Sequence, residues 1–292
     1  KLIETLHAYN DVVSFHDNYH DLYLDSPDFK DEYQIYDRDQ KPYFMSVWAG
    51  GKQSYMTGQM APVFFKRNLA YLKEHDLIDL LDDKTKQIIA YRLKYPESSD
   101  VFTCNPFDEN FNDAYRMNRK QCRECRNDTF DVCNERGMIV SSEEINVFAL
   151  NHIDTCHYAP YPFMMKQDGK QIGLPIPFFN LCFHDCVVIP WMSDRNYGLY
   201  ALLNGGIPYL ERDGAYVNTD GSFSEDVVDE KRIAMVKEIA SFEEKVAYAK
   251  MVRHTFVNGD ENIQETVFNN GITVTIDLRN DSYQIVERNA SK

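Results

Sequence analysis

The feature that most restricts the fold is an alternation of short apolar segments with longer amphipathic segments along roughly the first 210 residues. Strands that alternate with helices are typical of parallel βα units. A complete barrel of such units needs about 250 residues, so we expect a β/α barrel that lacks part of its N-terminal portion. The expected strands cover residues 12–15, 100–102, 138–140, 153–155 and 179–189, and the expected helices cover residues 61–74, 110–136 and 194–203.

A different pattern begins after Gly214. Residues 230–252 have the spacing of one long helix. Two β-prone runs follow at 266–268 and 272–276, and the Asn-Gly step between them is a strong hairpin signal. We therefore expect a barrel region over residues 1–213, followed by a helix and a C-terminal antiparallel β module over residues 214–292.

The formal net charge of −15 disfavours nucleic acid and anionic membranes as partners, because both attract clustered Lys and Arg. No run of about 18 apolar residues is present, so no transmembrane helix is expected. Neutral ligands such as sugars are compatible with the charge. The chain begins at Lys1 without a Met, which we interpret as a piece of a longer chain, so its location is left open.

Seven cysteines are an odd number in a chain of this size and do not predict a disulfide framework. Cys122, Cys125 and Cys133 resemble part of a metal site, but no second pair with suitable spacing follows. We expect reduced thiols on a helix, which slightly favours a cytoplasmic location.

Polar clusters stand at or near the ends of several expected strands. They comprise His16-Asp17, Asp100, the run Ser141-Ser142-Glu143-Glu144, Asp154 and His184-Asp185. In parallel α/β folds, functional groups gather at the C-terminal ends of strands. Buried acids are costly unless they are paired or functional. Each cluster alone is compatible with a structural role, whereas the set indicates a site.

Glycoside cleavage requires two carboxyl groups on either side of one sugar, about 5–5.5 Å apart in retaining enzymes. Carboxylates at the ends of neighbouring strands can meet that distance. An aromatic side chain provides an apolar platform for the sugar ring, and the candidates are Trp48, Trp191, Tyr19 and Tyr158.

Several strings resemble, in the same order, the barrel of proteins related to glycoside hydrolase families 129 and 101. They include His16-Asp17-Asn18-Tyr19, Trp48-Ala49-Gly50-Gly51, Asp100-Val101-Phe102, Val140-Ser141-Ser142-Glu143, the run from Phe179 to Val188, the run from Leu202 to Pro208, and the run from Asn270 to Val274. The resemblance covers nearly the whole chain. These families contain α-N-acetylgalactosaminidases and their relatives.

The resemblance implies a retaining α-glycosidase that acts on α-linked N-acetylgalactosamine or a related hexose. Asp100 matches the nucleophile and Glu143 matches the acid/base, with Asp108 and Glu109 as reserve candidates. We expect a carbohydrate substrate to be bound by His16, Asp17, Trp48, Asp154, His184 and Asp185. No cofactor is expected to be required, and a structural Ca²⁺ ion is compatible with the resemblance.

Two other functions remain open at this point. His16, Asp17, His20 and Asp21 bring imidazoles and carboxylates close together in sequence, which suits a metal-dependent hydrolase. The third possibility is a catalytically silent sugar-binding protein that retains only the barrel.

Overall fold

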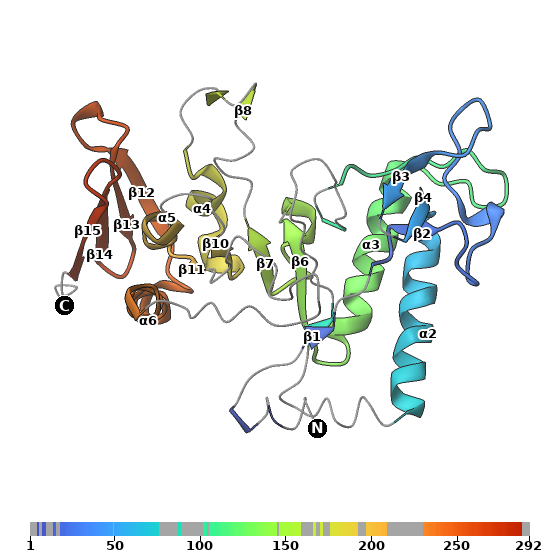
Figure 1. Ribbon diagram of the computed structural model, residues 1–292, viewed down its shortest axis with the longest axis horizontal. Helices are drawn as coiled ribbons and strands as arrows, with labels where there is room; N and C mark the ends of the chain where they lie inside the picture. The colour runs from blue at the N-terminus through green and yellow to red at the C-terminus, as the bar shows by residue number, and fades with distance from the viewer. Residues whose placement is uncertain are drawn as a thin grey trace, which may run out of the picture. The chain divides into compact units, whose positions relative to one another are not determined.

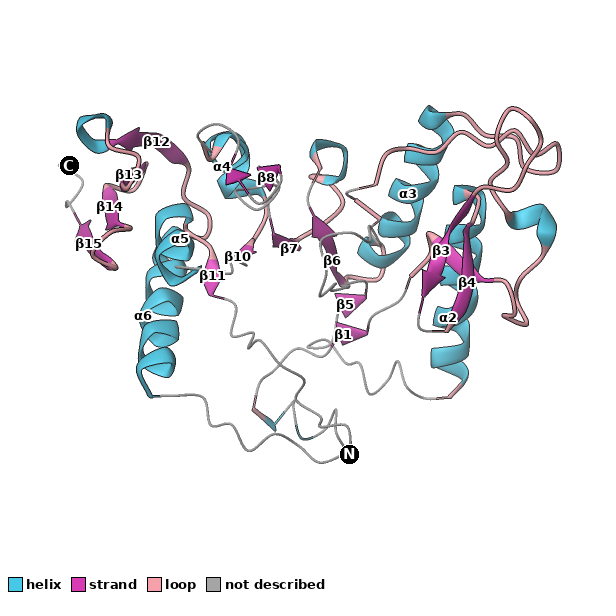
Figure 2. Ribbon diagram, turned by 45° about the horizontal axis from the view of Figure 1, so that its top comes forward, coloured by secondary structure: helices cyan, strands magenta, loops and turns pink. Residues whose placement is uncertain are grey.

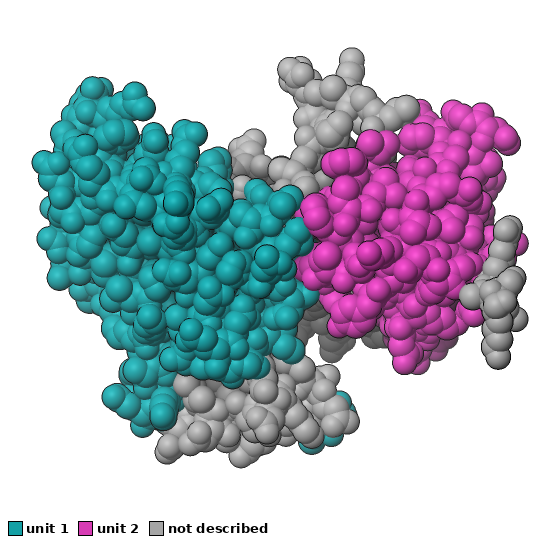
Figure 3. Space-filling view, turned by 180° about the vertical axis from the view of Figure 1, so that it is seen from behind, with its two compact units in different colours: residues 1–157 teal, residues 158–292 magenta. Residues whose placement is uncertain are grey.

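A computed structural model describes residues 5, 8–9, 14–15, 18–48, 50–75, 87–88, 102–103, 105–144, 146–158, 166–167, 170–171, 176–191, 197–208 and 230–287 (Figure 1). The chain forms two compact units, residues 1–157 and residues 158–292 (Figure 3). The division expected between residues 213 and 214 falls in 209–229, outside the described ranges, and stays a prediction. None of the helices in these ranges is long and apolar enough to cross a membrane.

Unit 1 contains a sheet with the strand order β1-β5-β6-β7. Its strands are β1 (Ser14–Phe15), β5 (Gln87–Ile88), β6 (Ile139–Glu144) and β7 (Thr155–Tyr158). β1 pairs with β5 in parallel, and β5 pairs with β6 in parallel. A helix lies between each parallel pair in the sequence, as expected for βαβ units. A closed barrel is not among the sheets that the described strands form.

Two helices of unit 1 that the structure describes in full, α2 (Ala61–Glu74) and α3 (Arg119–Asn134), lie side by side (Figures 1 and 2). α2 has the bounds expected from the sequence, and it buries Phe64, Phe65 and Leu69. The expected helix over residues 110–136 is too long at its start. Asn118 caps α3 by accepting a hydrogen bond from the backbone of Gln121 while the Gln121 side chain accepts one from the Asn118 backbone. Residues 110–118 therefore form a loop in which Asn110 and Met117 pair through their backbones.

A small antiparallel sheet, not expected from the sequence, lies between β1 and α2 in the chain. Its strands are β2 (Asp21–Tyr23), β3 (Phe44–Trp48) and β4 (Gly51–Tyr55), in the order β2-β4-β3. Short 3₁₀ helices η1 (Asp31–Tyr33), η2 (Gly58–Met60) and η3 (Val147–Ala149) complete the described elements of unit 1. Asp21 is the first residue of β2, an edge strand of this sheet, and His20 directly precedes it.

In unit 2, the segment that was expected to form a strand over residues 179–189 has a different structure. That segment forms the helix α4 (Phe178–Phe183) followed by the 3₁₀ helix η5 (His184–Cys186). A short apolar run has no period that distinguishes a strand from a helix, so the sequence pattern alone could not identify this helix. The other elements are β8 (Lys166–Gln167), β9 (Lys170–Gln171), β10 (Pro190–Trp191), α5 (Tyr197–Asn204), β11 (Ile207–Pro208) and α6 (Glu230–Val246).

The expected C-terminal antiparallel module is confirmed. Its strands are β12 (Met251–Phe256), β13 (Ile263–Phe268), β14 (Ile272–Asp277) and β15 (Ser282–Glu287), which pair in chain order, with the short 3₁₀ helix η6 (Val257–Gly259) after β12. α4 packs against β12, and α5 packs against β13 and β14. The turn before β14 uses Gly271 at a φ of 90°, a conformation that favours glycine. The α6 helix ends at Val246, six residues before the expected end, because Met251 already starts β12.

Glu243 on α6 provides a test of packing in unit 2. Its exposed fraction is 7%, and burial raises its pKa from the ordinary 4.5 to about 8. Within the described part of the chain, its Oε2 atom has no hydrogen-bond partner. The folded state therefore holds a proton that the unfolded chain releases above pH 4.5. This contribution to stability is fully present below that pH, and it is lost as the pH rises towards 8.

We expect Glu243→Gln to remove this dependence, because glutamine does not ionise. In the parent protein, the free energy of unfolding of unit 2 should fall by up to about 1.4 kcal/mol per pH unit across that window. Urea unfolding between pH 5 and pH 8 measures this slope. Glu244→Gln, at the exposed neighbouring position, is the control and should keep the parental slope. An unchanged slope in Glu243→Gln would contradict a buried, protonated Glu243.

Candidate active site

Arg126 is a buried arginine on α3, with an exposed fraction of 1%. It lies on a helix face that otherwise buries small and apolar groups, among them Cys122 and Phe130. Its guanidinium stands near the rings of Phe102 and Phe107, at 5.7 and 5.3 Å from the ring centroids. This environment is costly for a charge, so its hydrogen bonds decide whether it is tolerated.

The guanidinium of Arg126 donates four hydrogen bonds to one short stretch of chain. Nη1 donates to the carbonyl oxygens of Phe102 and Asn105 at 3.1 and 2.7 Å. Nη2 donates to the carbonyl oxygen of Pro106 at 3.0 Å and to Oδ2 of Asp108 at 3.2 Å. We call this stretch, residues 102–103 and 105–108, the anchor loop. Arg126 thus holds the anchor loop against α3 and fixes its backbone.

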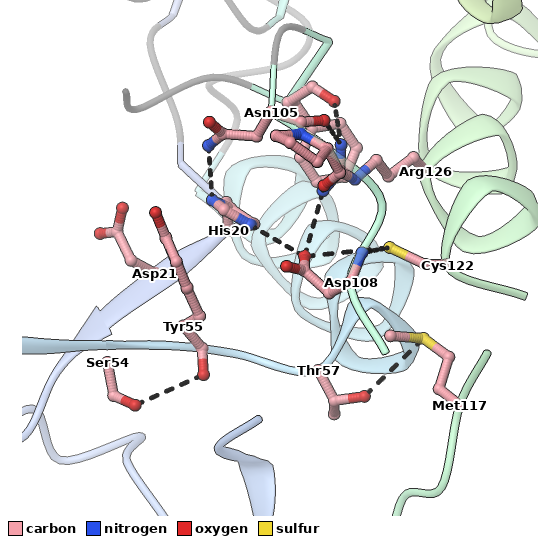
Figure 4. Close-up of polar contacts among 12 residues, drawn as sticks. His20, Asp21, Ser54, Tyr55, Thr57, Asn105, Asp108, Met117, Cys122 and Arg126 are labelled. Atoms are coloured by element: carbon pink, nitrogen blue, oxygen red, sulfur yellow. Dashed lines mark hydrogen bonds and ion pairs between the residues drawn. The ribbon is translucent and has the colours of Figure 1, made fainter. Parts of the chain in front are cut away.

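Asp108 is the anionic partner of Arg126, and its Oδ2 atom also bonds to the His20 ring (Figure 4). Burial raises the pKa of Asp108, but the hydrogen bond with His20 and the charge of Arg126 together lower the pKa by more than burial raises it, so the net direction is down. Asp108 is therefore a carboxylate at neutral pH. As a reserve nucleophile it is poorly suited, because Oδ2 is shared between two donors.

His20 joins the anchor loop to the segment that follows β1. Its ring has an exposed fraction of 4% and stands 4.2 Å from the ring of Tyr55. The Asn105 amide donates to Nδ1 at 3.0 Å, so the proton of the neutral ring lies on Nε2, which faces Asp108 at 3.1 Å (Figure 4). The imidazole therefore bridges two residues of the anchor loop.

A second bond joins the anchor loop to β6. The Thr103 hydroxyl donates to the Ser142 hydroxyl at 2.6 Å, and both residues are buried. Glu143 directly follows Ser142, and Asp100 precedes Thr103 by three residues, a stretch that spans at most about 11 Å. Asp100 lies outside the described residues, and Glu143 is described only as a residue of β6.

These bonds connect the segments that follow three parallel strands. β1, β5 and β6 run in the same direction, so their C-terminal ends share one edge of the sheet. His20 follows β1, the anchor loop follows β5, and Ser142 lies in the part of β6 beyond its pairing with β5. The convergence of the polar residues themselves at this edge stays a prediction, because the structure describes only some of their neighbours in sequence. His16 and Asp17 themselves lie outside the described residues.

Two further predicted residues of unit 1 have other surroundings. Asp154 is exposed; its Oδ2 accepts a hydrogen bond from the Val140 backbone at 2.8 Å, while its own backbone donates to the Val140 carbonyl at 2.9 Å. The carboxylate therefore ties the turn before β7 to β6. Trp48 is the last residue of β3, and its side chain lies outside the description. Tyr19, a candidate sugar platform, is a core residue instead, with its ring edge-on to Phe65.

His184 and Asp185 belong to unit 2 and to η5 rather than to a strand. His184 is buried, with Nδ1 2.7 Å from the Ala249 carbonyl oxygen and Nε2 3.0 Å from the Gly205 carbonyl oxygen. Its imidazole joins the end of α5 to the chain just before β12. Asp185 lies 3.8 Å from the ammonium group of Lys250. Convergence of these two residues with the site in unit 1 stays a prediction.

The half of the suggested metal motif that the structure describes is engaged in hydrogen bonds. Oδ1 of Asp21 accepts from Gln53 at 2.9 Å, and Oδ2 accepts from Asn18 at 3.1 Å. Across the described ranges, no group of His, Cys, Asp and Glu side chains is arranged to hold a metal ion. The thiols of α3 are free, and burial raises the pKa of Cys125 to about 11 and of Cys133 to about 12. They are therefore protonated thiols on a helix.

Solved structures of the α-N-acetylgalactosaminidase NagBb from Bifidobacterium bifidum are similar to this chain. The GalNAc complex of that protein is 35% identical, with a TM-score of 0.82, and the match covers 98% of this chain and 44% of that chain. Its ligand-free structure is 33% identical, with a TM-score of 0.81 and the same coverage. The chain thus spans less than half the length of the solved structures that it matches. No protein-family model and no curated protein sequence matches it. The similarity supports a glycosidase-related protein.

The sequence interpretation missed Arg126 and Asn105. A signal for Arg126 was present, because an arginine stands four residues after Cys122 and four before Phe130, on the apolar face of a predicted helix. An arginine at such a position requires buried acceptors. Asn105 carries no comparable signal, since an Asn-Pro step ordinarily indicates only a turn.

The bond between Thr103 and Ser142 can be measured by a double-mutant cycle. We expect Thr103→Val and Ser142→Ala to show a coupling of about 1 kcal/mol in the free energy of unfolding, because each removes the same hydrogen bond. Urea unfolding of the parent, the two single variants and the double variant gives this value. Ser26→Ala combined with Ser142→Ala is the control and should be additive, because Ser26 bonds the backbone of Asp28 instead. Additivity of Thr103→Val with Ser142→Ala would contradict the hydrogen bond between Thr103 and Ser142, which we call the tether.

Proposed function

We propose that this chain is part of the catalytic region of a retaining α-glycosidase that acts on α-linked N-acetylgalactosamine or a related hexose. The observation that carries the proposal is the 35% identity, over 98% of this chain, to a structure of an α-N-acetylgalactosaminidase in complex with GalNAc. A second complex of that protein, with Gal-NHAc-DNJ, matches with the same identity over 99% of this chain. Because the chain covers 44% of that protein, the activity of the whole protein is part of the proposal.

In the proposed reaction, Asp100 is the nucleophile and Glu143 is the acid/base. A carboxylate oxygen of Asp100 bonds to the anomeric carbon as the bond to the leaving oxygen breaks, and Glu143 donates its proton to that oxygen. Glu143 then takes a proton from water, whose oxygen bonds to the anomeric carbon and releases Asp100. The tether between Thr103 and Ser142 supports this pairing, because it joins the chain after Asp100 to the position before Glu143.

The two carboxyl groups need different protonation states in this reaction. Glu143 must hold a proton near neutral pH, while Asp100 must be ionised to attack. Glu144 follows Glu143 in β6. Repulsion between carboxylates at neighbouring positions favours retention of a proton by one of them, and the proposed mechanism assigns that proton to Glu143.

The proposed substrate site comprises His16, Asp17, Trp48, Asp154, His184 and Asp185. Because both ring nitrogens of His184 face backbone carbonyl oxygens, His184 would support the site rather than bond the sugar. The Asp side chains and His16 would hydrogen-bond the sugar hydroxyls, and the Trp48 ring would stack on the apolar face of the sugar. We further propose that β1, β5 and β6 belong to a β/α barrel. The parallel pairing of these strands supports this, as does the helix between each pair in the sequence.

Substitution of each of the two proposed catalytic carboxylates tests the mechanism in the full-length protein. We expect Asp100→Asn to lower kcat on aryl α-N-acetylgalactosaminides by at least about 1000-fold, because no nucleophile remains. Glu143→Gln should lower kcat about 100-fold or more on phenyl glycosides. The loss should be far smaller on dinitrophenyl glycosides, because dinitrophenolate leaves without being protonated. Azide should rescue Glu143→Gly and give a glycosyl azide of retained configuration.

Asp113→Asn, an exposed carboxylate in the loop before α3, is the matched control and should keep parental kinetics. Parental kcat in Asp100→Asn would refute the assignment of the nucleophile. If activity also disappeared on chelation and returned with zinc, a metal-dependent hydrolase using His16, Asp17, His20 and Asp21 would be favoured. Binding of GalNAc without turnover of any aryl glycoside would favour a catalytically silent sugar-binding protein.

A further inference from the structure

We propose that Arg126 is a positioning residue of the active site, which sets the nucleophile segment against β6 by fixing the anchor loop. The inference rests on the proposed function, since it concerns the separation of Asp100 and Glu143. Arg126 itself is buried on α3 and bonds to the loop rather than to a substrate.

The acceptors of Arg126 indicate that it sets the conformation of the anchor loop more than it stabilises the fold. Three of its four bonds go to carbonyl oxygens of the anchor loop, and only the fourth goes to a charge. A buried ion pair is often no more stabilising than apolar residues of similar volume. A planar guanidinium, however, offers several donors in fixed directions, so it restricts the carbonyl groups that it bonds to one arrangement.

One end of the fixed loop leads to the proposed reacting groups, and the other leads to a proposed substrate contact. Phe102, the first residue held by Arg126, follows Asp100 by two residues, and Thr103 bonds to Ser142 beside Glu143. At the other end, Asp108 and Asn105 hold His20, four residues after His16. A displacement of about 1 Å at reacting groups costs about 100-fold in rate, so a loosened loop would lower turnover.

Arg126→Lys is the variant that separates shape from charge. Lysine keeps the positive charge beside Asp108, but its ammonium group cannot satisfy three carbonyl oxygens and a carboxylate from one fixed plane. Arg123→Lys, at an exposed position of the same helix, is the matched control. Should Arg126→Lys fail to fold, His20→Gln tests the same loop from its other end.

The experiment uses 5-fluoro-α-N-acetylgalactosaminyl fluoride with the full-length protein. In the labelling step, an oxygen of Asp100 bonds to the anomeric carbon and fluoride leaves, so no proton from Glu143 is needed. Intact mass spectrometry follows both the rate of labelling and the final labelled fraction. We expect Arg126→Lys to be labelled about 100-fold more slowly than the parent, yet to reach the same final fraction. Arg123→Lys should match the parent, and His20→Gln should be slowed about 10-fold.

A purely structural role for Arg126 predicts the opposite pattern. The labelled fraction would then fall because fewer molecules are folded, while the labelled molecules would react at the parental rate. That result, or a parental rate and fraction in Arg126→Lys, overturns the positioning role and leaves the proposed function standing. Failure of the parent protein both to be labelled and to cleave aryl glycosides overturns the proposed function, and the positioning role with it.

Discussion

The hydrogen bonds that Arg126 donates to the anchor loop are the interaction on which the arrangement of unit 1 depends. They hold a buried guanidinium beside the part-buried carboxylate of Asp108, and three of them end on carbonyl oxygens of the same loop. Because buried donors are costly when unpaired, the loop and the helix specify each other's position. His20 and Ser142 then bond to a loop whose shape is already fixed.

This arrangement explains how a sheet with short strands presents polar groups in an ordered way. The paired parts of β1 and β5 are two residues each, too short to orient the segments that follow them. Hydrogen bonds between those segments provide the order that longer strands would otherwise give. The candidate site is therefore built from loop contacts anchored on α3, and the strands set only the edge at which they meet.

Much of the fold was predictable from periodicity, and the exceptions have local causes. The bounds of α2 and the hairpin at Gly271 follow from an amphipathic period and an Asn-Gly turn. The start of α3 was misplaced because the capping box of Asn118 and Gln121 lies inside a uniformly polar stretch. The apolar run from Phe179 was assigned to a strand, since it has no period. The polar residues proposed for the site stay a prediction, whereas the bonds of Arg126 and Asn105 were not predictable because they depend on contacts between segments distant in sequence.

Gly205 and His184 determine how the layers of unit 2 are held together. Gly205 has a φ of 61°, and a Cβ atom there would lie 2.4 Å from Nε2 of His184 and 3.0 Å from the ring of Phe268. There is thus no room for a methyl group at Gly205, between the end of α5 and Phe268 of β13. The imidazole of His184 bonds to both Gly205 and Ala249. Loosening one of these contacts would therefore disturb the packing of the others. The helical layer and the C-terminal sheet should consequently open together in hydrogen exchange, as one cooperative unit rather than as separate layers.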